Sequence, residues 1–159
     1  MQVEDNNRCF ACGKENPIGL RLDIQTVTVE HPNEDRPRAK RSDGEDLLVR
    51  TECTPPEHFQ GWANVIHGGV LSALLDEVIT YVAIAHFGGP AMTAQLDIRF
   101  KQPAPVGSKL LVTSRPINRS RRLVQAIAKI QLEDGTVIAE ATGKCLKAKD
   151  LPEAKGFDS

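Results

Sequence analysis

Two kinds of group that can do chemistry lie on one apolar segment of this chain. A His-Gly-Gly turn at 67–69 opens a run of aliphatic residues that extends to Phe87, and the run carries an adjacent carboxylate pair, Asp76 and Glu77. A carboxylate on a helix that is covered by protein is costly unless it is paired or used. The first backbone N–H groups of such a helix have no partner within it and carry partial positive charge. They could therefore hold an oxyanion.

Gly68 and Gly69 let a substrate carbonyl approach the backbone closely, because neither residue has a Cβ, and the Gly69 N–H is the predicted oxyanion donor. Tight packing of the helix is the alternative explanation for the two glycines. Asp76 lies seven residues beyond Gly69, which is about 10–11 Å along a helix axis. One helix cannot bring both groups to the same carbon atom, whereas a second, antiparallel copy could supply the missing half. The spacing therefore predicts a symmetric homodimer with two shared sites.

Asp76 is the predicted catalytic carboxylate, as a general base toward water or as a direct nucleophile. A carboxylate that is satisfied by hydrogen bonds in a dimer interface is the alternative. Ser72 and Thr80 share a helix face with Asp76 at spacings of four residues, and we assign Ser72 to substrate binding.

The segments around this helix predict an α+β fold. Gly88-Gly89-Pro90 should end the helix, and Glu133-Asp134-Gly135 should form a hairpin turn. An antiparallel sheet of five or six strands must then wrap around one long central helix. Alternating apolar and polar residues predict these strands at 18–29, 47–54, 93–100, 109–117, 123–132 and 137–146.

Length and composition favour one domain with an aliphatic core. The chain has 159 residues, 40% of them hydrophobic, and a formal net charge of -1. This balance argues against nucleic-acid or membrane partners recruited by charge. The N-terminus has no recognisable secretory signal and the carboxylates argue against a membrane span, so we expect a cytoplasmic location. We divide the chain into an N-terminal extension (1–17), a folded domain (18–148) and a polar tail (149–159).

Cys9-x-x-Cys12 has the spacing of half a zinc site. Zinc needs two further ligands, and the sequence has no second CxxC and no HxxxH pattern. We therefore predict no metal and a packed N-terminal loop, with structural zinc and a redox pair as alternatives. The isolated ligand candidates elsewhere are Cys53, Cys145, His31 and His58.

Three segments resemble the hotdog fold and, within it, the PaaI-type acyl-CoA thioesterases. They are H-G-G-V-L-S-A-L-L-D (67–76), T-A-Q-L-D-I-R-F-K-Q-P-A (93–104) and the terminal hairpin. The segment C-F-A-C-G-K-E-N-P-I-G-L (9–20) is similar to one found in a branch of that group. The resemblance covers 9–148, so that 18–148 would be the hotdog domain. It implies hydrolysis of an acyl-CoA to a carboxylic acid and free coenzyme A, with no cofactor beyond the coenzyme A of the substrate. It also implies a homodimer, with a dimer of dimers as the larger alternative.

The same resemblance implies roles for individual residues. Asp76 matches the catalytic acid of the family, whereas Glu77 is expected to be structural. His67 is expected to orient the turn. Thr93 matches a hydroxyl position at the start of the next strand and could help to place the attacking water.

The loop before His67 departs from the family pattern. The family's loop amide matches Gly61 here, so the amide could come from Gln60, assigned to catalysis, or from Asn64, assigned to substrate binding. Farther along, a basic cluster suits the phosphates of coenzyme A, with a solvated turn as the alternative. Its members are Arg119, Arg121 and Arg122.

Two other functions remain open. A hotdog hydratase or dehydratase acting on acyl-CoA or acyl-ACP needs a histidine and a carboxylate that converge on the substrate. A non-catalytic acyl-CoA-binding protein would use Asp76 only structurally. Release of free thiol from a panel of acyl-CoAs separates these two from a thioesterase.

Overall fold

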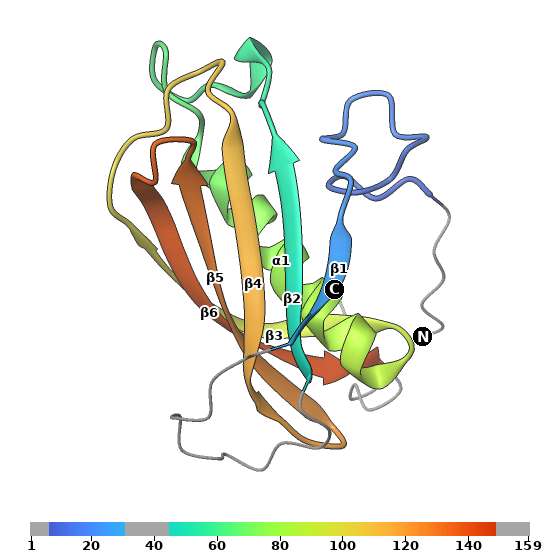
Figure 1. Cartoon of the computed structure of the whole chain (residues 1–159). Helices are drawn as coiled ribbons and strands as arrows, with labels where there is room; N and C mark the ends of the chain where they lie inside the picture. The colour runs from blue at the N-terminus through green and yellow to red at the C-terminus, as the bar shows by residue number, and fades with distance from the viewer. Residues whose placement is uncertain (1–6, 31–44, 149–159) are drawn as a thin grey trace, which may run out of the picture.

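The computed structural model describes residues 7–30 and 45–148 (Figure 1). They form one antiparallel sheet and one long helix, α1 (Gly68–Phe87), preceded by a short 3-10 helix, η1 (Glu57–Phe59). The sheet order is β1-β2-β4-β5-β6-β3. This is the predicted α+β layout of the hotdog fold. The strands are β1 (Gln25–Glu30), β2 (Glu45–Cys53), β3 (Ala91–Phe100), β4 (Leu110–Arg119), β5 (Leu123–Leu132) and β6 (Val137–Lys147).

Local signals set both ends of α1. His67 is the N-cap and its imidazole accepts a hydrogen bond from the Gly69 N–H. At the other end Gly88 has the left-handed conformation (φ 63°) that a glycine adopts without strain. Its N–H donates to the Ile84 carbonyl at 2.9 Å. The predicted bounds of the helix are confirmed.

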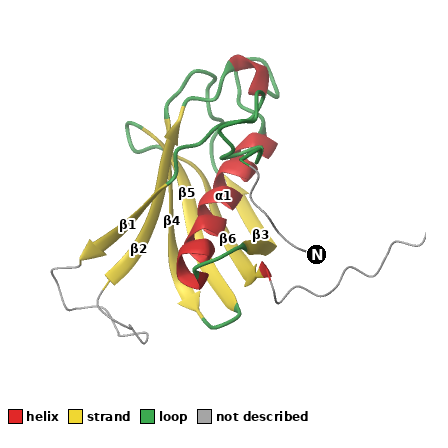
Figure 2. Cartoon of the chain, turned by 90° about the vertical axis from the view of Figure 1, so that its right-hand side faces the viewer, coloured by secondary structure: helices red, strands yellow, loops and turns green. Residues whose placement is uncertain are grey.

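The helix lies along one face of the sheet (Figure 2), and its apolar side forms the core with the strands. In contrast, Ala73, Asp76, Thr80 and Ile84, spaced by three or four residues, remain half-buried. By length and composition alone α1 could cross a membrane, but a core helix meets the same test. Its buried residues are Val70, Leu71, Leu74, Leu75, Val78, Ile79, Val82 and Ala83.

Strand β3 lies at one edge of the sheet. It pairs with β6, where Thr93 lies opposite Cys145. Among the described residues nothing pairs with its other edge. An open strand edge presents unpaired N–H and C=O groups to any chain that docks there.

The strand predicted at 18–29 is wrong in its first part, because β1 begins only at Gln25. Upstream of that residue the backbone bonds to the N-terminal loop instead of to a strand. The Leu20 N–H donates to the Phe10 carbonyl and the Leu22 N–H to the Ala11 carbonyl, both at 2.9 Å. Alternation of side chains describes an extended chain, but it does not reveal which backbone groups that chain pairs with.

Parts of the predicted domain division fall outside the described residues. The polar tail (149–159) and the first six residues of the N-terminal extension are among them. The connection between β1 and β2 (31–44) lies outside as well. These boundaries therefore stay predictions.

Candidate active site

Asp76 is held by a residue of the edge strand. The Thr93 hydroxyl donates a hydrogen bond of 2.6 Å to Asp76 Oδ1. The same Thr93 Oγ1 lies 3.1 Å from Thr80 Oγ1, one helical turn beyond Asp76, and 3.9 Å from the Cys145 sulfur. Asp76 thus belongs to a small, half-buried polar cluster between α1 and β3, which orients its carboxylate.

The start of α1 offers a different oxyanion donor from the predicted Gly69 N–H. The Gly69 N–H donates to His67 Nδ1 at 2.8 Å, and the Val70 N–H donates to the His67 carbonyl at 2.9 Å. In the described part of the chain the Gly68 N–H has no acceptor. The candidate donor therefore moves from Gly69 to Gly68, and His67 is the residue that engages the second glycine.

A groove of about 770 Å³ opens beside this helix start. Its walls include His67, Gly68 and Leu71 from the helix side and Phe100 from β3. Trp62, whose side chain is 85% exposed, lies on its rim. The remaining lining residues are Gly61, Val65, Ile66, Lys101, Gln102, Pro103 and Ala104. A groove lined mainly by apolar residues, with His67, Lys101 and Gln102 among them, is suited to an acyl or pantetheine chain.

Among the described residues, neither of the two predicted loop amides is hydrogen-bonded to the start of α1, and that of Gln60 bonds within the loop. The Gln60 side-chain oxygen accepts a hydrogen bond from the Asn64 N–H at 3.2 Å, and Asn64 adopts a left-handed conformation (φ 62°). Neither residue lines the groove. Gly61, the position that matches the family's amide, packs against His67, since a Cβ there would lie 3.1 Å from the imidazole Cδ2.

Ser72, assigned to substrate binding, is occupied within the helix. Its hydroxyl donates to the Gly68 carbonyl at 2.8 Å. This bond keeps Ser72 close to the helix start but uses its hydroxyl hydrogen.

The basic cluster lies at the far end of α1. Three arginines are exposed there: Arg119 at the end of β4, and Arg121 and Arg122 on the turn to β5. Ser120 of this turn lies next to the helix end, since its carbonyl is 3.0 Å from His86 Nε2. A helix of 20 residues is about 30 Å long. Within one chain the basic cluster and the groove therefore lie at opposite ends of α1.

Cys145 contributes to the cluster around Asp76, which the sequence alone does not reveal. Cys145 lies opposite Thr93 in the register of β3 and β6, and its thiol is buried. Burial raises the pKa of this thiol. Alternation along the last strand marks Cys145 as facing the core, but the strand register that brings it to Thr93 is not visible in the sequence.

Comparison with protein-family models matches residues 63–139 to the Thioesterase superfamily. This region contains α1, β3, β4, β5 and the first residues of β6. The match therefore includes both the helix start and the cluster around Asp76.

Curated proteins with similar sequences carry the name acyl-coenzyme A thioesterase. THEM4 of Mus musculus is 33% identical over 91 residues, which are 57% of this chain and 39% of that protein. THEM5 of Mus musculus is 32% identical over 96 residues, 58% of this chain and 38% of that protein. The chain thus matches less than half the length of these relatives.

Solved structures share the fold. The E. coli PaaI protein from the phenylacetic acid degradation operon has a TM-score of 0.59 at 19% identity, over 63% of this chain and 72% of that one. A thioesterase protein from Streptococcus pneumoniae TIGR4, solved with coenzyme A, has a TM-score of 0.58 at 17% identity, over 62% and 77%. The chain therefore shares the hotdog fold of these structures, and its residues 63–139, just under half of its length, match the Thioesterase superfamily.

Proposed function

We propose that this protein hydrolyses an acyl-CoA thioester to a carboxylic acid and free coenzyme A. The observation that carries the proposal is the 2.6 Å hydrogen bond that orients Asp76 beside an open strand edge. The similarity to acyl-coenzyme A thioesterases supports the substrate class. The coenzyme A bound to the Streptococcus pneumoniae structure belongs to that protein and supports the same class here.

In the proposed reaction Asp76 is the general base. It takes a proton from a water molecule, and the resulting hydroxide attacks the thioester carbonyl carbon. The oxyanion that forms accepts a hydrogen bond from the Gly68 N–H at the positive end of α1. Collapse of this intermediate breaks the carbon–sulfur bond, and the coenzyme A thiolate leaves and takes up a proton. Thr93 acts as a positioning residue by holding the carboxylate.

A nucleophilic role for Asp76 is the alternative chemistry. The carboxylate would then attack the thioester itself and form a mixed anhydride, which water would hydrolyse. A single turnover in ¹⁸O-labelled water distinguishes the two. Label in the Asp76 side chain supports the nucleophile, whereas label confined to the acid product supports the general base.

We propose further that the site is shared between two chains. Gly68 and Asp76 are eight residues apart, about 12 Å along the axis of α1, which is too far for both to reach one carbonyl group. An antiparallel partner helix, docked along the open edge of β3, would bring its Gly68 toward this Asp76. It would also bring the partner's groove toward the basic turn of this chain. We therefore assign Arg119, Arg121 and Arg122 to the coenzyme A phosphates of the partner's site.

The test is a panel of short, long and aromatic acyl-CoAs with a free-thiol readout on the purified chain. Thiol release under multiple-turnover conditions is the expected result. Hydration of an enoyl-CoA without thiol release would support the hydratase alternative. Saturable binding of acyl-CoA without any turnover would support a binding protein, and either result overturns the proposal.

A further inference from the structure

The N-terminal loop places both thiols of Cys9-x-x-Cys12 against α1. The sulfur atoms of Cys9 and Cys12 and a carboxylate oxygen of Glu77 all lie within 4.8 Å of one another. The Cys9 sulfur is 3.9 Å from Glu77 Oε1. The chain thus supplies a third ligand-type group that lies far from the two cysteines in sequence, on the helix turn that also carries Asp76.

The loop is tightly folded around the two thiols. The Gly13 N–H donates to the Cys9 carbonyl at 3.0 Å, and a Cβ at Gly13 would lie only 2.4 Å from the Cys9 nitrogen. A glycine is therefore required directly after the second cysteine. The tight turn brings the backbone segments of the two cysteines close together.

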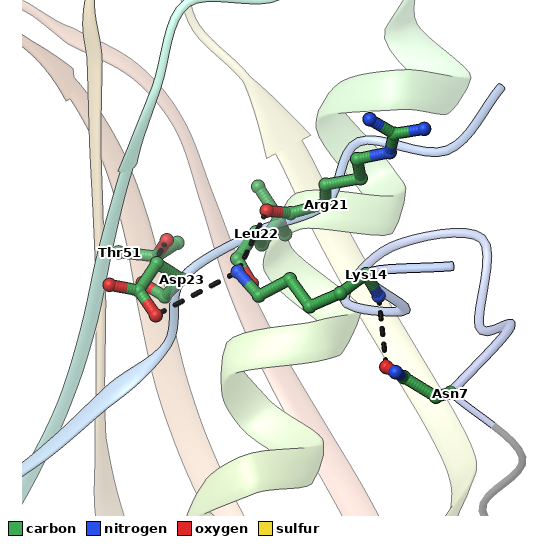
Figure 3. Close-up of polar contacts among 6 residues, drawn as sticks. All are labelled: Asn7, Lys14, Arg21, Leu22, Asp23 and Thr51. Atoms are coloured by element: carbon green, nitrogen blue, oxygen red, sulfur yellow. Dashed lines mark hydrogen bonds and ion pairs between the residues drawn. The ribbon is translucent and has the colours of Figure 1, made fainter. Parts of the chain in front are cut away.

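Polar contacts of Lys14 fasten the same loop (Figure 3). The Lys14 N–H donates to the Asn7 side chain at 3.0 Å. Its ammonium group donates to the carbonyls of Arg21 and Leu22, both at 3.1 Å, and lies 3.8 Å from the Asp23 carboxylate. The ammonium group of Lys14 therefore binds the segment at 21–23. It does not neutralise the Cys9, Cys12 and Glu77 cluster.

The surroundings of Cys12 differ from those of a redox-active thiol. Burial, followed by the hydrogen bond with Glu77, raises the pKa of the Cys12 thiol to about 12. Thiols that exchange disulfides have a lowered pKa, because the thiolate is the attacking form. The surroundings of Cys12 raise the pKa of its thiol instead, which argues against a redox pair.

We propose that Cys9, Cys12 and Glu77 bind one zinc ion, with water at the fourth tetrahedral position. Zinc–sulfur bonds near 2.3 Å and a zinc–oxygen bond near 2.1 Å place the ligand atoms about 3.6–3.8 Å apart. The present separations therefore need to shorten by about 1 Å or less. Two sulfur ligands select zinc over the oxygen-preferring magnesium and calcium. Binding converts two thiols to thiolates and releases one proton from each.

Such an ion would link the N-terminal loop to the helix of the active site. Phe10, between the two cysteines, packs edge-on against Phe59 with ring centroids 6.2 Å apart, and Phe59 lies in the segment that leads to the groove. The role of this ion would be structural. Glu77 and Asp76 are consecutive residues, so they lie on different faces of α1 and Glu77 does not face the substrate.

The experiment uses the purified full-length chain, reduced and stripped of metal, titrated with Co²⁺ and then with Zn²⁺. We expect one Co²⁺ per chain, with the near-ultraviolet thiolate charge-transfer band and the visible bands of a tetrahedral ion. Binding of either ion to the metal-free chain should release two protons per ion, and Zn²⁺ should then displace the Co²⁺ without further proton release. Metal analysis of freshly purified protein should find one zinc ion per chain. None of these readouts depends on thioesterase activity.

Variants identify the ligands. Cys12→Ser should remove the charge-transfer intensity, and Glu77→Gln should weaken zinc binding by at least about 10–100-fold, the loss that even an outer-shell change causes. Cys53→Ser, which alters a half-buried thiol elsewhere, is the matched control and should bind zinc as the parent does. If Cys12→Ser does not fold, Glu77→Gln and Cys53→Ser decide the outcome. The proposal is overturned if the reduced chain binds no stoichiometric metal, if Cys9 and Cys12 form a disulfide in the purified protein, or if Glu77→Gln binds zinc like the parent.

Discussion

The hydroxyl of Thr93 donates a hydrogen bond of 2.6 Å to the carboxylate of Asp76, and this contact joins the edge strand of the sheet to the central helix. The left-handed turn at Gly88 sends the chain back along α1 as β3, which brings the two residues together. The carboxylate is thereby held at the face of the molecule where β3 has an open edge.

Replacement of Asp76 tests the chemistry most directly. Asp76→Asn keeps the size of the side chain and its ability to accept from Thr93, but it removes the base. We expect kcat to fall by about 10²–10⁴-fold, the usual contribution of a general base, with little change in KM. Steady-state kinetics with the best substrate of the acyl-CoA panel measure this. Asp97→Asn, at an exposed position of β3, is the control and should retain full activity. An unchanged kcat for Asp76→Asn would remove the mechanism.

The hydrogen bond from Thr93 has its own test. Thr93→Val keeps the shape of the side chain and deletes the donor, whereas Thr93→Ser keeps the hydroxyl. A hydrogen bond to a charged group contributes about 1.5–3 kcal/mol, so Thr93→Val should lower kcat by about 10–100-fold. Thr93→Ser should stay close to the parent. Equal activities for the two variants would mean that Asp76 needs no positioning by this hydroxyl.

The Gly68 N–H can be deleted without breaking the helix. Proline is favoured at the first helical position because that N–H has no intrahelical partner, and the extended conformation of His67 (φ -60°, ψ 134°) suits a residue before proline. Gly68→Pro should lower kcat by about 10²–10³-fold, as expected for loss of an oxyanion donor. Gly68→Ala keeps the N–H, and its Cβ would lie 3.6 Å from the Phe100 ring, an ordinary contact. It should therefore remain active. A fully active Gly68→Pro would return the assignment to another donor.

Mixing two inactive variants tests whether the site is shared. After unfolding and refolding together, half of the dimers formed from Gly68→Pro and Asp76→Asn chains should be mixed. Each mixed dimer would have one site with both lesions and one intact site, so the activity should recover to about a quarter of the parent value. Light scattering on the same samples measures the dimer. A monomer at micromolar concentration, or no recovery on mixing, would contradict the shared site.

The thiol of Cys53 should make the free energy of unfolding fall at alkaline pH. Burial raises its pKa from 9.0 to about 11, so the folded state keeps a proton that the unfolded chain loses. The stabilisation is complete below pH 9 and is lost as the pH rises toward about 11, by up to about 2–3 kcal/mol. Urea unfolding between pH 7 and pH 11 should show a smaller decline for Cys53→Ala than for the parent. Identical slopes would mean that this thiol does not contribute.

Local patterns were sufficient to predict much of the architecture. The bounds of α1 follow from the His67 cap and the glycine at 88, and the hairpin follows from Asp134-Gly135, because caps and turns depend on residues a few positions apart. The predicted strand is wrong over residues 18–24, because local patterns do not show which distant backbone a segment pairs with. Its alternation was correct, but its backbone partner is the N-terminal loop, which no local pattern reveals.

The sequence by itself determined that an apolar helix with a glycine-rich start carries a carboxylate, and that Gly68 or Gly69 lies too far from Asp76 to act on the same carbon within one helix. Side-chain positions were decided only by the tertiary structure. The His67 imidazole accepts from the Gly69 N–H and not from the Gly68 N–H. The Thr93 hydroxyl on the edge strand donates to Asp76 on the helix. The Glu77 carboxylate lies close to the sulfur atoms of Cys9 and Cys12. These contacts depend on the register of strands and the packing of distant segments, which sequence periodicity does not encode.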